Sequence, residues 1–203
     1  TDVQRVSSDG RLLFEWSPFD HFAIGLADPR ELVKADVNWT HGNSLDLMPD
    51  GNLVVSFRNL SEITKIDTET GAVMWRLGGR ANAFSFGGAQ PMGFVGQHSV
   101  RATAGNAIAL LDNLGDATQS RGERYEIDEQ SMTARLVGSY GSVPGVTTQI
   151  GGSVQDLPNG HTLVSFGTAG RVEEYDAAGR VVWRIERGAD YVFHAQRIRS
   201  LYG

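Results

Sequence analysis

Two histidines, an asparagine and an arginine stand at the ends of strand-like segments and could act on an anionic group. His41 and Asn43 precede one such segment, and Arg58 follows the next. His98 precedes a third. Imidazole is a competent nucleophile and proton carrier near neutral pH. The arginine fork binds paired oxygen atoms and the asparagine amide adds a neutral donor, so this set suits chemistry on an anionic tetrahedral group.

Other kinds of site fit the sequence less well. The set has no Ser-His-Asp order and no pair of carboxylates, which weakens a serine hydrolase or glycosidase interpretation. The chain has no cysteine, so disulfides and thiolate chemistry are excluded. Asp112, Asn113 and Asp116 could form a calcium-type loop, but they lack the spaced ligands of a strong metal motif. We therefore predict neither a metal nor a cofactor.

The composition indicates an ordinary globular protein. The chain has 203 residues, 40% hydrophobic and 21% charged, which is enough for a sizeable core. A net charge of −6 argues against nucleic acid or an anionic membrane as the main partner. No apolar run is long enough to span a bilayer, so we expect no membrane insertion.

A predicted hairpin brings the first candidate residues together. Leu45 and Leu47 alternate with polar residues, as a half-buried strand requires. The Pro-Asp-Gly turn at 49–51 suits a tight reversal, and a β-rich apolar run follows it. Because a hairpin brings its outer ends together, we expect His41 to lie beside Arg58.

The four-strand pattern of residues 41–77 returns later in the chain. Aligning Pro158 on Pro49 gives an offset of 109 residues, which also places Phe166 on Phe57. A more divergent copy lies between the two. Repeats of about 40–60 residues, each with four antiparallel strands, are typical of β-propeller blades. We therefore predict an all-β chain that forms a partial β-propeller of four-stranded antiparallel blades.

The predicted organisation is a single partial propeller domain over residues 1–203. A blade tail at 1–16 precedes blades at about 39–79, 97–140 and 152–187. This is about three and a half blades, and a propeller closes its ring to protect its strand edges. We therefore expect completion by further blades or by another chain, as in a homo-oligomer.

Three long connections, at 17–38, 79–96 and 141–152, are predicted to be loops between blades. A short helix is expected near 29–32 in the first of them. Loops on one face of a propeller commonly build its site.

The last repeat tests whether the polar set serves blade architecture. The offset maps these residues onto apolar or glycine positions: His41 onto Ile150, Asn43 onto Gly152 and Arg58 onto Gly167. The proline, glycine and phenylalanine of the scaffold persist while the polar set vanishes, which favours a site. Two alternatives stay open, namely a loop histidine bonded to the backbone for His41 and a buried, hydrogen-bonded histidine for His98.

An ordered series of motifs resembles the arylsulfotransferase family, and more closely its branch of arylsulfotransferase-like propeller proteins. The motifs are Trp-Thr-His-Gly-Asn-Ser at 39–44, Ser-Phe-Arg-Asn at 56–59, Trp-Arg-Leu-Gly-Gly at 75–79, Gln-His at 97–98 and Leu-Asp-Asn at 111–113. The resemblance runs from about residue 3 to the end. Asn38 departs from it, because that position is usually acidic.

The resemblance implies a six-bladed propeller that moves a sulfuryl group from an aryl sulfate to a phenol. It points to His98 as the histidine that is transiently sulfated, in a ping-pong mechanism. His41, Asn43 and Arg58 would hold the sulfuryl oxygens, and no nucleotide sulfate donor is needed. A further catalytic histidine of the family belongs to an earlier blade than those present here. The family also implies a periplasmic or extracellular location.

Three functions compete. The first is sulfuryl transfer, and the second is a non-catalytic propeller that binds a small anion, a glycan or a protein. A third and weaker one is a hydrolase in which water replaces the phenol. A structure that places His98 near His41 and Arg58 would favour the enzyme, whereas imidazoles pointing apart into apolar core would favour the binding module.

Overall fold

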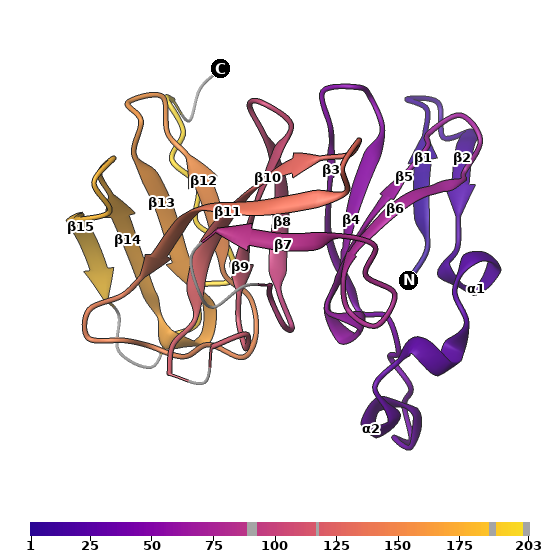
Figure 1. Ribbon diagram of the computed structural model, residues 1–203, viewed down its shortest axis with the longest axis horizontal. Coiled ribbons are helices and arrows are strands. Elements are labelled where there is room, and N and C mark those ends of the chain that lie inside the picture. The colour runs from indigo at the N-terminus through magenta and orange to yellow at the C-terminus, as the bar shows by residue number, and fades with distance from the viewer. Residues whose placement is uncertain (89–92, 117, 187–189, 201–203) are drawn as a thin grey trace.

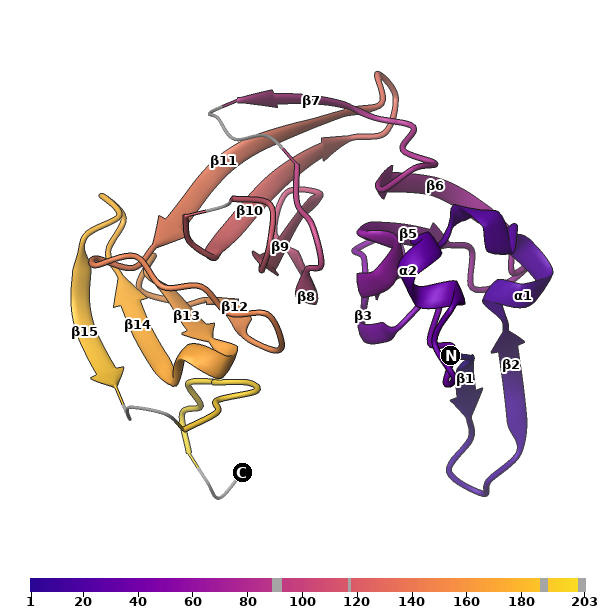
Figure 2. The ribbon, with the colours of Figure 1, turned by 90° about the horizontal axis from the view of Figure 1, so that it is seen from below.

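A computed structural model describes residues 1–88, 93–116, 118–186 and 190–200. The strands form four sheets that stand side by side in an arc around a common axis (Figure 1, Figure 2). This arrangement is the partial β-propeller that the sequence predicts. In the described ranges, no helix is long and apolar enough to cross a membrane.

The second sheet along the chain contains the predicted hairpin. Its strands pair antiparallel in chain order: β3 (Gly42–Leu47), β4 (Leu53–Phe57), β5 (Glu62–Ile66) and β6 (Val73–Gly78). The turn between β3 and β4 places Gly51 at φ 83°, which glycine adopts without strain. A short 3-10 helix, η2 (Arg58–Leu60), follows β4. β3 lies at the inner edge of the arc, next to the axis (Figure 2).

The fourth sheet matches the second one strand by strand. Its strands are β12 (Ser153–Asp156), β13 (Thr162–Phe166), β14 (Arg171–Tyr175) and β15 (Val181–Glu186), with a 3-10 helix η3 (Gly167–Ala169) after β13. β4 and β13, η2 and η3, and β5 and β14 each begin 109 residues apart. The alignment that the prolines suggest is therefore also the alignment of the backbone.

The third sheet has five strands rather than four. They are β7 (Ser85–Gly88), β8 (His98–Thr103), β9 (Ala107–Asp112), β10 (Arg121–Asp128) and β11 (Thr133–Gly141). β7 pairs in parallel with β11 at the outer edge, so the prediction of a loop throughout 79–96 is wrong at these residues. The close approach uses Gly88, since a Cβ there would lie 2.5 Å from the carbonyl oxygen of Leu136.

A two-stranded sheet and a helical connection precede the hairpin. The strands are β1 (Val3–Val6) and β2 (Leu12–Trp16), and the connection holds α1 (Pro18–His21), η1 (Ile24–Leu26) and α2 (Pro29–Leu32). α2 is the short helix expected near 29–32. The side chain of Asp28 caps it by accepting from the backbone amide of Arg30 at 2.9 Å.

Aromatic side chains between neighbouring sheets set the spacing of the arc. Trp16 packs on Phe57, Trp75 is buried among the side chains between the second and third sheets, and Tyr140 packs on Tyr175. Burial of each such ring contributes about 1.5–3 kcal/mol. Next to the axis, β8 contacts both β3 and β12 directly.

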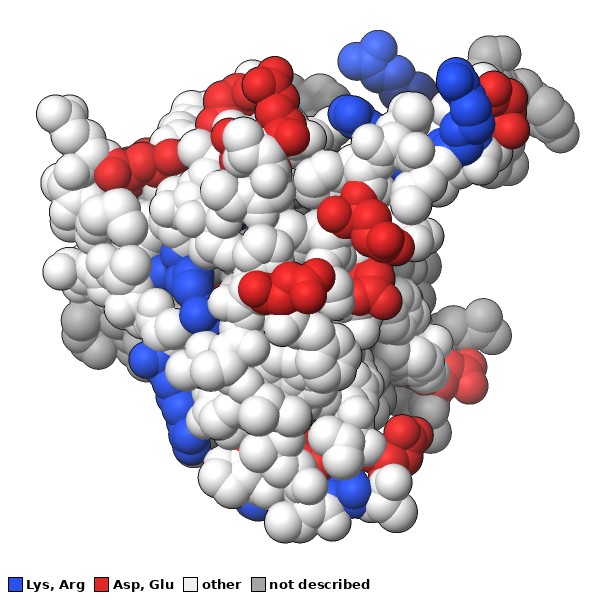
Figure 3. All heavy atoms as spheres, turned by 90° about the vertical axis from the view of Figure 1, so that its right-hand side faces the viewer, with Lys and Arg blue, Asp and Glu red and all other residues white. Residues whose placement is uncertain are grey.

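The face at the β1–β2 end is mixed in charge. Figure 3 shows acidic side chains scattered over a broad uncharged area, with basic side chains toward its edges. This pattern agrees with the net charge of −6.

Candidate functional site

The hairpin joins His41 to Arg58. The backbone amide of Arg58 donates to the carbonyl oxygen of His41 at 3.0 Å, and that of Asn59 donates to Thr40 at 3.1 Å. His41 adopts φ 49°, which is uncommon for a residue with a Cβ. The side-chain oxygen of Asn38 accepts from the His41 amide at 3.2 Å and supports this conformation.

His98 lies beside His41 at the start of β8. The two ring centroids are 6.1 Å apart, at an interplanar angle of 76°. His98 is 2% exposed. The Asn43 side chain donates to the carbonyl oxygen of Gln97 at 2.7 Å and so joins the start of β8 to β3. The structure therefore brings the four predicted residues to one region, where the inner strands β3 and β8 begin.

A hydrogen bond to Asn113 determines which ring nitrogen of His98 carries the hydrogen. The ring Nδ1 lies 2.9 Å from Asn113 Oδ1. Asn113 Nδ2 donates to the carbonyl oxygens of Thr148 and Gly151, each at 3.0 Å, so its oxygen end must face the ring. Nδ1 of His98 therefore carries the hydrogen, and Nε2 keeps its lone pair.

Asn38 gives His41 the opposite tautomer. Because Asn38 Oδ1 accepts from the His41 amide, its Nδ2 is the atom that lies 3.1 Å from the ring Nδ1. An amide nitrogen only donates, so Nδ1 of His41 accepts and Nε2 carries the hydrogen. The pair thus combines one ring with a free Nε2 lone pair and one ring with an Nε2–H donor.

Both imidazoles favour the neutral form. Burial lowers the pKa of His41, and the positive charge of Arg58 lowers it further. Burial also lowers the pKa of His98. The hydrogen bond that Nδ1–H donates to Asn113 opposes this shift, while Arg58 and His41 add to it electrostatically. A neutral His98 is the form that can act as a nucleophile near neutral pH.

Arg58 has an unused donor inside the protein. Its Nη1 donates to Asn59 Oδ1 at 2.8 Å, and its Nη2 donates to the carbonyl oxygen of Gln149 at 3.0 Å. Its Nε is buried and lacks a hydrogen-bond partner among the described residues. The Nε atoms of Arg121, Arg124 and Arg171 share this feature, so it does not by itself mark a ligand site. The charge of Arg58 is nevertheless close enough to lower the pKa of both His41 and His98.

A cavity of about 370 Å³ opens beside this arginine. It is lined by Arg58, Asn59 and Gly96, and by the charged segment around α2 that includes Arg30 and Lys34. The cavity offers a route by which an anionic compound could approach the guanidinium.

Asn43 and Asp112 have structural contacts of their own. The Asn43 oxygen accepts from Ser44 Oγ at 3.0 Å, so the amide is engaged at both ends and retains one free N–H. Asp112 accepts from the backbone amides of Val95 and Gly115, each at 2.9 Å. Among the described residues, no group of three or more His, Cys, Asp or Glu side chains could hold a metal ion.

Sequence reasoning gave no role in the site to the two asparagines that orient the rings. From the sequence, Asn113 belongs to a calcium-type loop and to the Leu-Asp-Asn motif of the family resemblance, and Asn38 is a departure from the family pattern. A signal for Asn113 was present, since Phe-Arg-Asn at 57–59 and Leu-Asp-Asn at 111–113 each place an asparagine just beyond a buried strand.

Comparison with known proteins gives a family and a fold. A family model described as arylsulfotransferase (ASST) matches residues 2–188. A search of curated proteins finds no significant match.

Several solved structures share the fold. A catalytically inactive virginiamycin B lyase from Staphylococcus aureus with quinupristin has a TM-score of 0.53 and 10% identity, covering 92% of this chain and 48% of that chain. A protein of unknown function from Bacteroides caccae has a TM-score of 0.47 and 18% identity, covering 90% of this chain and 53% of that chain. The chain therefore spans about half the length of these structures. At 10% identity, the likeness to the lyase shows the fold alone.

Proposed function

Because the chain belongs to the arylsulfotransferase family, we propose that it transfers a sulfuryl group from an aryl sulfate to a phenol through a sulfohistidine at His98. One observation carries the proposal. A buried, neutral imidazole with a free Nε2 lone pair lies beside a second imidazole, 6.1 Å away between ring centroids, whose Nε2–H can donate, and the charge of Arg58 acts on both rings. The first group is a nucleophile, and the second is a donor for the anion it would attack.

In the first half-reaction, Nε2 of His98 attacks the sulfur of the aryl sulfate. The N–S bond forms while the S–O bond to the ring breaks, and the electron pair leaves with the phenolate. The imidazole becomes cationic, and the Asn113 oxygen stabilises its Nδ1–H. Charge spreads over the three sulfuryl oxygens, where the positive charge of Arg58 and the Nε2–H of His41 would stabilise it, as in the related phosphoryl-transfer problem.

In the second half-reaction, an acceptor phenol attacks the same sulfur. The new O–S bond forms while the N–S bond breaks, and His98 recovers its lone pair. The acceptor releases its phenolic proton to solvent and the first phenolate takes one up, so protons balance over the cycle. Asn43 would hold the start of β8, and with it His98, in place through its bond to Gln97.

A non-catalytic binding propeller is the second candidate. Asn38, which stands where the family pattern usually has an acidic residue, favours it. In that case the same guanidinium would hold a small anion, a glycan or a protein group without transfer. Family membership also supports a periplasmic or extracellular location as part of the proposal.

The test uses p-nitrophenyl sulfate as donor and 4-methylphenol as acceptor, with His98→Ala and a control, His161→Ala. His161 is bonded to Glu174 near the β12–β13 turn, away from the site. We expect phenol-dependent nitrophenol release that falls at least about 1,000-fold in His98→Ala and stays unchanged in the control. Mass spectrometry after donor alone should find one sulfuryl group on the peptide that contains His98. No release by the wild-type protein, together with binding of sulfate by calorimetry, would favour the binding module.

A further inference from the structure

The segment after the fourth sheet is bonded to β12 in the same way that β8 is bonded to β3. On β3, Ser44 Oγ accepts from the Val100 amide at 2.8 Å, and Asp46 Oδ2 accepts from the Ala102 amide at 3.0 Å. These side chains hold β8 against β3. They are the contacts that fix one inner strand beside the next.

The residues 109 positions later make the same contacts. Ser153 Oγ accepts from the Ala195 amide at 3.1 Å, and Gln155 Oε1 accepts from the Arg197 amide at 2.8 Å. Gln155 Nε2 also donates to the carbonyl oxygen of Arg197 at 3.1 Å. The segment 193–198 thus lies beside β12 as β8 lies beside β3, which brings His194 toward the axis.

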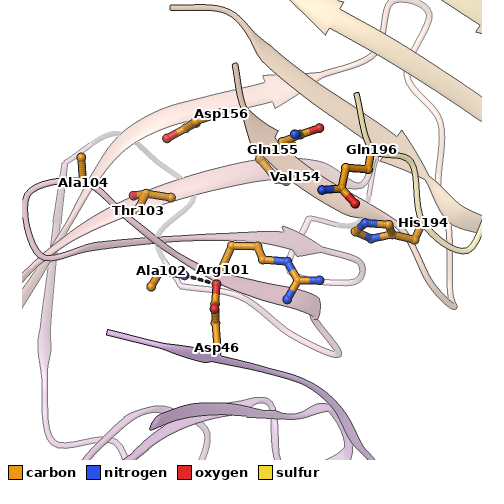
Figure 4. A pocket seen from close by; sticks show the side chains of 10 residues that line it. All are labelled: Asp46, Arg101, Ala102, Thr103, Ala104, Val154, Gln155, Asp156, His194 and Gln196. Atoms are coloured by element: carbon orange, nitrogen blue, oxygen red, sulfur yellow. Dashed lines mark hydrogen bonds between the residues drawn. The ribbon is translucent and has the colours of Figure 1, made fainter. Parts of the chain in front are cut away.

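A second, open cavity of about 480 Å³ lies between β3, β8, β12 and this segment. Figure 4 shows that the Arg101 side chain extends from β8 toward His194 and Gln196 on the C-terminal segment. We call this space, lined by Arg101, His194, Gln196, Asp46 and Asp156 among others, the axial cavity.

A β-bulge places Arg101 on the same side of β8 as His98. His98 pairs with Leu111 and Arg101 pairs with Ala109, so three steps along β8 match two steps along β9. The extra residue coincides with Ser99 at φ 59°. Paired residues project to the same face of a sheet, so His98 and Arg101 leave the same side of β8, about 7 Å apart along the strand.

Arg101 is the available cation of the axial cavity. Among the described residues its guanidinium makes one hydrogen bond, from Nη1 to the carbonyl oxygen of Leu45 at a long 3.3 Å. The oxygens of Asp46 accept from the backbone amides of Leu47 and Ala102. Asp156 is the other acidic group of the lining, and it lies 3.8 Å from Arg124.

The remaining groups are neutral donors or weakly charged. Burial lowers the pKa of His194, and the charge of Arg101 lowers it further, which favours the neutral ring. Gln196 adds an amide. One guanidinium with two neutral donors suits a single carboxylate, while the two acidic side chains disfavour a polyanion.

We propose that the axial cavity binds the carboxylate of a para-substituted phenol, with Arg101 as its main partner and His194 and Gln196 as supporting donors. The acceptor class is then a hydroxyaryl carboxylic acid rather than a neutral phenol. The phenolic oxygen would point along β8 toward His98. This proposal rests on the proposed sulfuryl transfer and adds the class of acceptor to it.

The test measures kcat/KM for 4-hydroxyphenylacetate and for 4-methylphenol with p-nitrophenyl sulfate as donor. We expect the wild-type protein to prefer the acid by about 10- to 100-fold, the range that one charge-assisted pair supplies. In Arg101→Met this ratio should fall close to one. Arg5→Met, on exposed β1, is the matched control and should keep the wild-type ratio.

A charge reversal keeps the test independent of general damage. Arg101→Glu should prefer tyramine, whose tail is cationic, over 4-hydroxyphenylacetate, so that the order of acceptors inverts. Arg101→Lys should give an intermediate ratio because it keeps the charge and loses the fork. A wild-type protein with no preference for the acid, or an Arg101→Met variant with an unchanged ratio, would overturn the proposal.

Calorimetry separates this proposal from the function on which it rests. If the wild-type protein sulfates neither phenol, sulfuryl transfer fails and binding decides the role of the axial cavity. Binding of 4-hydroxyphenylacetate that weakens at least tenfold in Arg101→Met supports the carboxylate site on its own. Equal binding of 4-hydroxyphenylacetate and 4-methylphenol, or equal binding by the two proteins, rejects it.

Discussion

The second and fourth sheets share a backbone and contribute to the site in different ways. In the β3–β6 sheet, the hairpin ends carry His41, Asn43 and Arg58. In the β12–β15 sheet, the matching positions near the hairpin ends carry no polar side chain. Instead, the loop before β12 supplies backbone carbonyl oxygens that accept from Arg58 and from Asn113.

Glycine residues allow the loop before β12 to bring its carbonyl oxygens close to Arg58 and Asn113. A Cβ on Gly152 would lie 2.1 Å from a methyl carbon of Leu111, and one on Gly167 would lie 2.1 Å from the carbonyl oxygen of Ile150. The chain before β12 therefore packs closer to its neighbours than a side chain would allow. The second sheet thus supplies His41 and Arg58 beside the nucleophile of the third sheet. The loop before the fourth sheet supplies the acceptors that hold Arg58 and, through Asn113, His98.

The largest effect is expected from a substitution that gives the second sheet the residue of the fourth. Arg58→Gly places at η2 the residue that η3 has at Gly167. We expect kcat for p-nitrophenyl sulfate to fall about 100- to 1,000-fold, because one guanidinium that stabilises developing charge is lost. Single-turnover kinetics measures the loss in the sulfation step.

The matched control is Arg30→Gly, which removes a cation from the same cavity lining without touching the histidines. Its kcat should stay within threefold of the wild-type value. A wild-type kcat in Arg58→Gly would show that the Arg58 guanidinium does not stabilise the transferred group.

The fold and the first members of the site were accessible from the sequence for physical reasons. Strand alternation, Pro-Asp-Gly and Pro-Asn-Gly turns and the offset of 109 residues are local patterns, and they predicted the blades. His41 and Arg58 became neighbours through one hairpin. The extra strand β7 was not accessible in this way, because it pairs with β11 across a long separation in the sequence.

The orienting residues were harder to predict because their roles depend on distant backbone. Asn113 holds His98 only because Thr148 and Gly151 turn their carbonyl oxygens toward its amide. A carbonyl oxygen is present at every residue and leaves no trace in the sequence. The axial cavity was missed for the same reason, since Arg101 and His194 meet only through the docking of the last segment on β12.

The link between His98 and the fourth sheet can be broken at Asn113. In Asn113→Ala the ring loses its partner, and the carbonyl oxygens of Thr148 and Gly151 lose a donor. We expect the free energy of unfolding to fall by about 1–3 kcal/mol and kcat to fall about 10- to 100-fold. Urea denaturation and steady-state kinetics measure the two effects.

Asn113→Asp separates positioning from stability. A carboxylate still accepts from Nδ1–H, and its charge raises the pKa of His98. His98 must be neutral to attack, so activity should be present above the raised pKa and lost as the pH falls through it. The acid limb of the kcat profile should therefore move to higher pH. An unmoved limb would mean that Asn113 does not govern the proton of His98.

The smallest expected effect is that of Asn38→Asp, which tests whether His41 acts as a neutral donor beside the nucleophile His98. In Asn38→Asp a carboxylate faces Nδ1 of His41 in place of an amide NH₂, which raises the pKa of that ring. A doubly protonated His41 can give its Nε2 proton to a departing phenolate. We expect turnover of 4-methylphenyl sulfate, a poor leaving group, to rise about tenfold relative to p-nitrophenyl sulfate. The gain should be present below the raised pKa and lost as the pH rises through it, so pH profiles with both donors decide whether Asn38 keeps His41 a neutral donor.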